Sequence, residues 1–180
     1  MLTWFAKRFL AKFERQWGYD TSYARDMLDA GGYEAIAPMF GIQKVTKYRR
    51  DIPNDVLATA GLVGVRAGDC GPCLQLGVKM ALHEGVPQQT IAAVLSGDRE
   101  AMSESVRLSY DFTRSVLARD GQDGPLREAL EQRYGKRAII SLAYTIAASR
   151  FYPDLKYALG AGHACSRVRV GDLDVIPQPV

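Results

Sequence analysis

The sequence predicts an all-α protein. Apolar residues recur at steps of three and four through most of the 180 residues, which is the spacing of one face of an α-helix. Glycine, proline and short polar clusters separate these periodic segments, and we find no convincing series of strands between them. A hydrophobic content of 47% and a charged content of 24% are ordinary for a globular domain with a sizeable core.

Three parts are expected along the chain: an N-terminal amphipathic helix or arm (1–19), a helical domain (20–165) and an extended C-terminal tail (166–180). Residues 2–17 carry a heavy aromatic face opposite mostly basic residues. We expect this face to pack on the protein's own core or on a neighbouring subunit, and binding to a membrane surface is the alternative. The face consists of Leu2, Phe5, Phe9, Leu10, Phe13 and Trp17.

The remaining elements are delimited by glycine and proline signals. Residues 18–52 are predicted to form short helices broken at Gly18, Gly31-Gly32 and Pro38, followed by a solvated basic connection. The tail from Arg167 shows a brief alternation and two prolines, so we expect an extended arm there. The other predicted segments, in order, are a helix from Pro53 to near Gly68, one through Leu74 to Gly85, one from Val86-Pro87 to Gly97, helices over 99–119, 126–134 and 136–151, a loop over 120–125 and a turn over 154–159.

Charge and composition exclude several classes of protein. A net charge of +3 without a basic stripe and interleaved aromatics argues against nucleic-acid binding. Three cysteines do not form a disulfide framework, and a lone C-x-x-C pair without secretory context indicates a reducing compartment. The N-terminus lacks the pattern of a signal peptide, and the longest apolar stretch, 138–149, is too short to span a bilayer. We therefore expect a cytoplasmic protein, and we predict no cofactor and no resident metal.

Two cysteines, Cys70 and Cys73, flank a Gly-Pro pair at the start of a predicted helix. Residues at i and i+3 of a helix face the same way with Cβ atoms roughly 5–6 Å apart, and a disulfide needs about 3.8 Å. A modest tightening of the turn would therefore join the sulfurs. Pro72 suits the first turn of a helix, and a helix N-terminus favours thiolate over thiol. The pattern predicts a redox-active dithiol.

Other interpretations of the pair stay open. Cys-Gly-Pro-Cys is also the thioredoxin tetrapeptide, but residues 55–66 before it are predicted to be helical, so a thioredoxin fold is not expected. The two residues could be inert core cysteines. They could also form a structural zinc site with His163 and Cys165, although His-Ala-Cys is tighter than the usual ligand spacing.

Four features follow one another along the sequence. They are a predicted helix that starts with a proline, a Cys-x-x-Cys pair that opens a long helix, the segment Glu84-Gly85-Val86-Pro87, and a helix that ends at Gly97-Asp98. This order resembles the carboxymuconolactone decarboxylase / alkylhydroperoxidase AhpD-like family, over roughly residues 20–160. The resemblance implies an all-helical bundle assembled as trimers or hexamers, with a thiol-dependent peroxidase or disulfide-reductase activity. It implies that Cys73 attacks a small hydroperoxide or disulfide, that Cys70 resolves the product, and that a dithiol donor returns the electrons.

The sequence departs from this family at its proton relay. The family's histidine four residues after the second cysteine and its glutamate about twelve before the first correspond here to Gly77 and Ala58. His83 lies ten residues beyond Cys73, about 15 Å along a helix, so it cannot serve as the local base.

Three charged residues are candidates for a supporting role. Asp55 could face the pair from the preceding helix, Asp69 adjoins Cys70, and Arg66 could offset the charge of Asp69. A carboxylate beside a thiol opposes thiolate formation unless it accepts the proton. The alternative function is therefore a non-catalytic or redox-sensing helical oligomer of the same fold.

Overall fold

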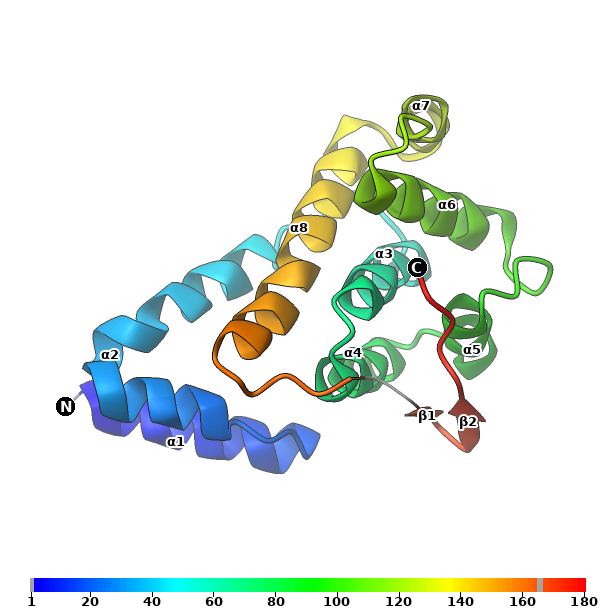
Figure 1. The fold of residues 1–180 in the computed structure, drawn as a ribbon. Coiled ribbons are helices and arrows are strands. Elements are labelled where there is room, and N and C mark those ends of the chain that lie inside the picture. Colours follow the sequence, from blue (N-terminus) through cyan, green and yellow to red (C-terminus); the bar gives the residue numbers. More distant parts are fainter. Residues whose placement is uncertain (1, 165–166) are drawn as a thin grey trace.

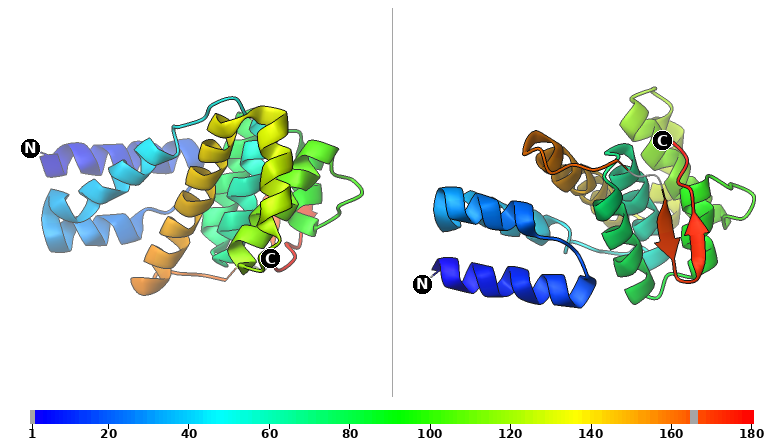
Figure 2. Two further views of the ribbon diagram at one scale, coloured as in Figure 1. Left: turned by 90° about the horizontal axis from the view of Figure 1, so that it is seen from above. Right: turned by 60° about the horizontal axis from the view of Figure 1, so that its bottom comes forward.

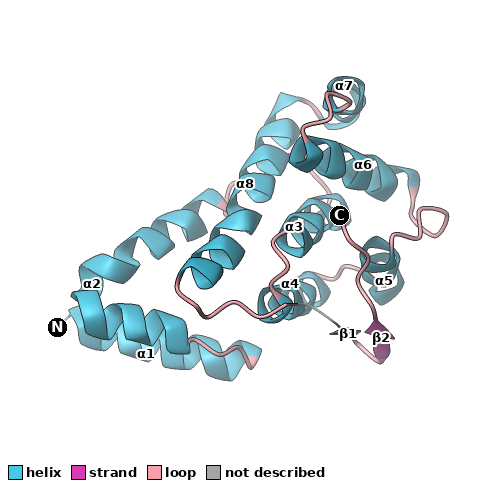
Figure 3. Cartoon of the chain, viewed as in Figure 1, coloured by secondary structure: helices cyan, strands magenta, loops and turns pink. Residues whose placement is uncertain are grey.

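The computed structural model describes residues 2–164 and 167–180, and within them the chain folds into eight helices and one short hairpin (Figures 1 and 3). The all-α prediction is confirmed. In the described residues, no helix combines the length and the apolar character that crossing a bilayer requires. The elements are α1 (Leu2–Trp17), α2 (Ser22–Val45), α3 (Asn54–Ala67), α4 (Gly71–His83), α5 (Gln88–Ser96), α6 (Glu104–Ala118), α7 (Asp123–Tyr134), α8 (Lys136–Ala158), β1 (Val168–Val170) and β2 (Leu173–Val175).

Helix α3 lies at the centre of the body, which we define as α3–α8 with the hairpin (Figure 1). It packs against α4, α5, α6 and α8. Half of its residues are buried, and Val56 and Ala60 are fully inaccessible to solvent. A helix that is buried on several sides needs apolar residues around most of its circumference, and this explains why α3 lacks a distinct polar face.

Two glycines bring α3 and α8 into close contact. A Cβ atom built on Gly64 would lie 1.9 Å from Ser149 Oγ, and one on Gly68 would lie 2.5 Å from Pro153 Cβ. Gly64 and Gly68 are four residues apart on α3 and its C-terminal cap, and Ser149 and Pro153 are four apart on α8. The crossing therefore requires small residues at two successive turns, and it holds the C-terminal end of α8 against the start of α4.

Helices α1 and α2 form an arm, residues 2–45, that projects from one side of the body (Figure 2). A turn at Gly18, whose φ is 57°, reverses the chain between them. Gly32 has a φ of 66° and produces a kink in α2, which confirms the break predicted at this position. The break predicted at Pro38 is wrong, because this proline lies inside α2.

Three predicted boundaries also differ from the structure. Helix α6 begins at Glu104 and not at 99, because the Ser103 hydroxyl caps it by accepting a hydrogen bond from the Val106 amide. Helix α7 begins three residues early, since Pro125 is tolerated in a first turn, where amides have no helical partner. Helix α8 continues to 158 and includes the turn predicted separately over 154–159.

The C-terminal tail is not a free extended arm. Its alternation forms an antiparallel hairpin with Val168 opposite Val175. Val168 and Val170 are buried in the main core cluster, beside α4 and α5. Beyond the hairpin, the Gln178 amide donates to the Leu95 carbonyl. The short alternation was too brief to predict a strand pair, and burial against the helices stabilises it.

Candidate functional site

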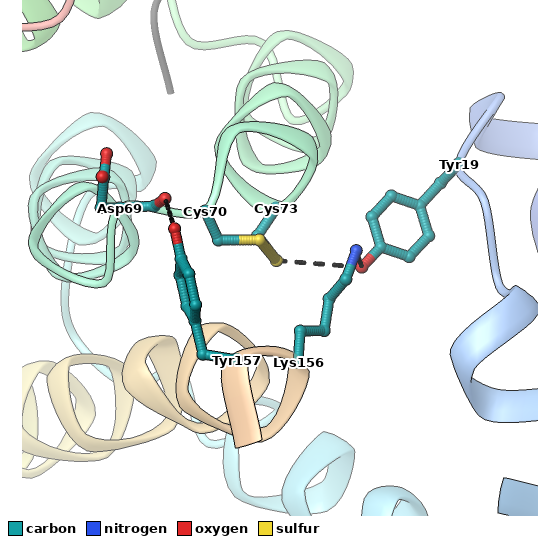
Figure 4. Close-up of a disulfide and its surroundings, with 6 residues drawn as sticks. All are labelled: Tyr19, Asp69, Cys70, Cys73, Lys156 and Tyr157. Atoms are coloured by element: carbon teal, nitrogen blue, oxygen red, sulfur yellow. Dashed lines mark hydrogen bonds between the residues drawn. A yellow bond between two sulfur atoms is a disulfide. The ribbon is translucent and has the colours of Figure 1, made fainter. Parts of the chain in front are cut away.

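The cysteine pair lies at the first turn of α4, as the sequence predicts. Cys70 is the residue before the helix, Pro72 occupies its second position and Cys73 its third. The two sulfurs form a disulfide across Cα atoms 5.3 Å apart (Figure 4). Cys70 is fully buried and Cys73 is 6% exposed. Both sulfurs therefore sit at the positive end of a helix, away from bulk water, where a thiolate is favoured by the helix dipole.

Two residues that the sequence analysis did not single out contact Cys73 or its neighbour (Figure 4). The Tyr19 hydroxyl and Cys73 Sγ lie 3.8 Å apart and share a hydrogen bond. Lys156 Nζ, from the last turns of α8, donates to the same hydroxyl over 3.5 Å. Its ammonium also lies 5.1 Å from the ring centres of Tyr19 and Tyr23. The Cys73 sulfur, the Tyr19 phenol and the Lys156 amine thus form a hydrogen-bonded series in that order.

Burial controls the electrostatics of this group. Desolvation raises the pKa of Tyr19 to about 12 and raises the pKa of Tyr23 further. Desolvation also lowers the pKa of Lys156, and the negative charge of Asp20 opposes that shift. Lys156 is only 4% exposed. A buried amine faced by two neutral phenols holds its proton less firmly than a surface lysine does.

The opposite side of the pair is closed by backbone contacts. Tyr157, next to Lys156 on α8, donates its hydroxyl hydrogen to the Asp69 carbonyl over 2.9 Å. The Gly71 amide donates to the His163 carbonyl over 2.9 Å. These contacts attach the end of α8 and the segment after it to the start of α4, on the side where Cys70 is buried.

A cavity of about 660 Å³ lies between the arm and the body, and Cys73 lines it. Cys70 does not line it. Its wall on α4 consists of Cys73, Leu76, Gly77, Met80, Ala81 and Glu84. From Cys73 to Glu84 this wall extends about 16 Å, at 1.5 Å per helical residue. Most of the lining is apolar, and an ion pair of 2.6 Å between Arg49 and Glu84 lies at the far end.

The predicted supporting residues are placed differently from one another. Arg66 pairs with Asp69 at 2.7 Å and also donates to the carbonyls of Pro177 and Gln178. Asp55 is the second residue of α3, about 18 Å along that helix from its end near the pair, and its carboxylate accepts from the Val56 amide. The structure therefore places the Arg66–Asp69 ion pair beside Cys70 in the chain, with the Asp69 carboxylate exposed and turned away from the sulfurs, and it does not bring Asp55 near the pair.

Gly77 and Ala58, the positions of the missing relay, both line the cavity that contains Cys73. A Cβ atom on Gly77 would make an ordinary contact, 3.4 Å, with Leu62. Both positions therefore contribute no polar side chain to the wall of the cavity. His83 lies at the other end of α4, where its ring packs edge-on against Trp17 with centroids 5.5 Å apart.

The zinc alternative involves two further residues of the tail. His163 is exposed, and Cys165 lies outside the described residues. Among the residues that the structure does describe, no three histidine, cysteine or acidic side chains are grouped as metal ligands would be.

The chain matches no protein-family model, and no curated protein and no solved structure is significantly similar to it.

Tyr19 and Lys156 were missed because no local pattern marks them. Tyr19 is 54 residues from Cys73, and Lys156 is 137 residues from Tyr19. The one usable signal was the apolar surrounding of Lys156, between Leu155 and Tyr157 close to a proline, which is unusual for a lysine on a solvated helix end.

Proposed function

We propose that the protein is a thiol-disulfide oxidoreductase or thiol-dependent peroxidase that uses the Cys70–Cys73 pair, in the manner of AhpD-like proteins. The observation that carries this proposal is the asymmetry of the pair. Cys73 lines a large apolar cavity and contacts a phenol, whereas Cys70 is fully buried behind it. One sulfur is thus placed to meet a substrate, and the other is placed to meet only its partner.

The reaction divides into two thiol steps. The Cys73 thiolate attacks the distal oxygen of a hydroperoxide, which breaks the O–O bond and leaves a sulfenic acid and an alkoxide that takes up a proton. The Cys70 thiol then attacks the sulfur of that sulfenic acid, so that the disulfide forms and water leaves. A dithiol donor reduces the disulfide by exchange and is itself oxidised to a disulfide.

The apolar lining supports a substrate with an apolar body, because burying such a group against this wall is favourable. Gly77 and Ala58 are small residues that line the same cavity as Cys73, which is consistent with room for a substrate there. The second candidate function, a redox-sensing oligomer, is favoured by the same two positions, since neither supplies a proton relay.

Turnover by cysteine variants tests the proposal. We expect thiol-dependent reduction of an organic hydroperoxide such as cumene hydroperoxide, or of a small disulfide, by the native protein with a dithiol donor. Cys73→Ser should abolish it, and Cys70→Ser should permit a single turnover and then stop at the sulfenic acid. The third cysteine of the sequence provides the matched control, since Cys165→Ser should retain turnover. If no hydroperoxide and no disulfide is reduced by the native protein, the proposal fails and the redox-sensing function gains support.

A further inference from the structure

We infer that Lys156, acting through the hydroxyl of Tyr19, takes the proton of the Cys73 thiol and later returns it to the leaving group. The return step rests on the proposed function, because it needs a substrate. The removal of the thiol proton is a property of the reduced site alone. Tyr19 is the catalytic residue in this scheme, since it touches the reacting sulfur, and Lys156 is a positioning residue that acts through it.

The geometry supplies a continuous path. Cys73 Sγ lies 3.8 Å from the Tyr19 hydroxyl oxygen, and that oxygen lies 3.5 Å from Lys156 Nζ. A tyrosine hydroxyl can accept one hydrogen bond while it donates another. With the amine of Lys156 unprotonated, the Tyr19 hydroxyl donates to the amine nitrogen, so the phenol proton moves to the amine as the thiol proton moves to the phenol oxygen. The products are a thiolate and an ammonium, with the phenol unchanged.

The surroundings of Lys156 explain why the amine is free to act. The side chain is 4% exposed, and none of the ion pairs found in the described part of the chain includes it. Burying a charge without a partner is costly, so an ammonium at this position gains when an anion forms nearby. The Cys73 thiolate is such an anion. Transfer of the Cys73 thiol proton would therefore create the ammonium and its counter-charge together.

The charged and titratable groups around the amine are consistent with this role. Tyr19 and Tyr23 face it from the loop after α1 and from α2. Burial raises the pKa of both phenols, so at neutral pH they donate hydrogen bonds and carry no charge. Asp20 is the one acidic group that acts on the pKa of Lys156, from an exposed position beside Arg25.

The step balances with a hydroperoxide as oxidant. The thiolate attacks the distal oxygen, the S–O bond forms as the O–O bond breaks, and the alkoxide receives the proton held by Lys156 through Tyr19. Cys73 is oxidised to the sulfenic acid, and the hydroperoxide is reduced to an alcohol. Cys70 and the dithiol donor then complete the cycle as described above.

The experiment measures Cys73 alone, in a Cys70→Ser background where the disulfide cannot form. The rate of alkylation by iodoacetamide as a function of pH reports the pKa of the Cys73 thiol. We expect Lys156→Met and Tyr19→Phe each to raise that pKa by about one unit, which lowers alkylation at neutral pH about tenfold. Because the two residues act as one path, the double variant should show about the same shift as either single variant.

Matched variants separate this effect from general damage. Lys79→Met removes a half-buried lysine of α4 that donates to the Trp17 carbonyl, and Tyr110→Phe removes the hydroxyl of another buried tyrosine. Both should leave the alkylation profile unchanged. Met and Phe keep the apolar bulk of the replaced residues, and thermal unfolding of each variant checks the fold.

The inference is overturned if Lys156→Met and Tyr19→Phe leave the profile where it is, or if the matched variants move it equally. Its failure is distinguishable from that of the proposed function, because alkylation needs no hydroperoxide. If the variants shift the alkylation profile but the native protein shows no turnover, the inference is supported and the proposed peroxidase function is contradicted. If the native protein shows turnover but the variants leave the profile unshifted, the proposed function is supported and the inference is contradicted.

Discussion

At the scale of single residues, Glu14 joins the two helices of the arm. Its carboxylate pairs with Arg25 at 2.7 Å and accepts a hydrogen bond from the Thr21 amide over 3.0 Å. The hydrogen bond from Arg25, followed by that from Thr21, lowers the pKa of Glu14 from 4.5 to about 2. A pKa that falls on folding means that the charged form stabilises the folded state. This stabilisation is complete above pH 4.5 and is lost as the pH falls toward 2.

We expect Glu14→Gln to unfold at lower denaturant concentration than the native protein at pH 6, with the difference shrinking below pH 4.5 and vanishing near pH 2. Urea unfolding followed by tryptophan fluorescence at a series of pH values measures this. Glu128→Gln removes an exposed carboxylate with only a 3.8 Å partner, Arg127, and should show no such pH dependence. A Glu14→Gln deficit that persists unchanged at pH 2 would contradict the assignment.

The predictable part of the site is the part encoded locally. Cys70, Pro72 and Cys73 are close in sequence, and the start of α4 falls where their pattern predicts it. Tyr19 and Lys156 reach Cys73 only through tertiary packing, and sequence periodicity carries no information about such contacts. Asp55 was predicted to support the cysteine pair because it lies on the helix that precedes the pair. In the structure, Asp55 lies at the end of α3 that is far from the pair.

At the scale of elements, the crossing of α3 and α8 determines where the amine of the site lies. Gly68 contacts Pro153, and Lys156 follows Pro153 by three residues, about one helical turn. One turn back along both helices, Gly64 contacts Ser149. The two contacts fix the separation of the helix axes, so the position of Lys156 depends on residues that touch neither sulfur.

We expect Gly64→Ala to destabilise the fold by about 1–3 kcal/mol, the usual cost of overpacking a tight contact. Equilibrium urea unfolding measures the change. Gly61→Ala, on the same helix, is the control, because its added Cβ meets only Thr145 at an ordinary 3.4 Å. That variant should be neutral or gain up to about 1 kcal/mol from helix propensity. Equal losses in both variants would contradict a specific role for the crossing.

Helices were predicted correctly where the apolar periodicity extends over many residues. The prediction failed where a single proline was taken as the end of a helix. Pro38 and Pro153 were expected to interrupt or follow helices, yet both lie inside them. Pro153 is buried against Gly68 of the neighbouring helix, and this packing outweighs the hydrogen bond that the proline removes, whereas Pro38 is exposed and has no such contact to explain it. The hairpin at 168–175 is the opposite case, since its three-residue strands are too short to predict and depend on the helices beneath them.

At the scale of the whole molecule, the outer end of α1 is left uncovered. Leu2, Trp4 and Phe5 are each more than half exposed, and Phe9 is 39% exposed. The predicted aromatic face is therefore only partly used: Leu10 is buried, and Phe13 and Trp17 are partly buried. An exposed cluster of large apolar side chains at the tip of a projecting arm is typical of a surface that another subunit covers.

We propose that this cluster is an interface of a homo-oligomer, and we expect the native protein to have a mass in solution that is a multiple of 19.8 kDa. The double variant Trp4→Ser, Phe5→Ser should reduce that mass to a monomer in light scattering coupled to gel filtration. Ile176→Ser, which removes an equally exposed apolar residue from the tail, should leave the oligomer intact. A native protein that is monomeric at micromolar concentration would contradict the proposal.

The burial of Cys70 restricts the shape of whatever reduces the disulfide. An exchange reaction needs an incoming sulfur in line with the bond it breaks, and only Cys73 lines a cavity through which such a sulfur can come. The end of α8 and the segment at 161–164 are hydrogen-bonded to Asp69 and Gly71, the residues on either side of the fully buried Cys70. A broad, flat protein surface cannot enter a cavity between two layers of helices. For the proposed exchange we therefore expect an electron donor that presents its thiol on a slender group, such as a small free dithiol or a long flexible side arm.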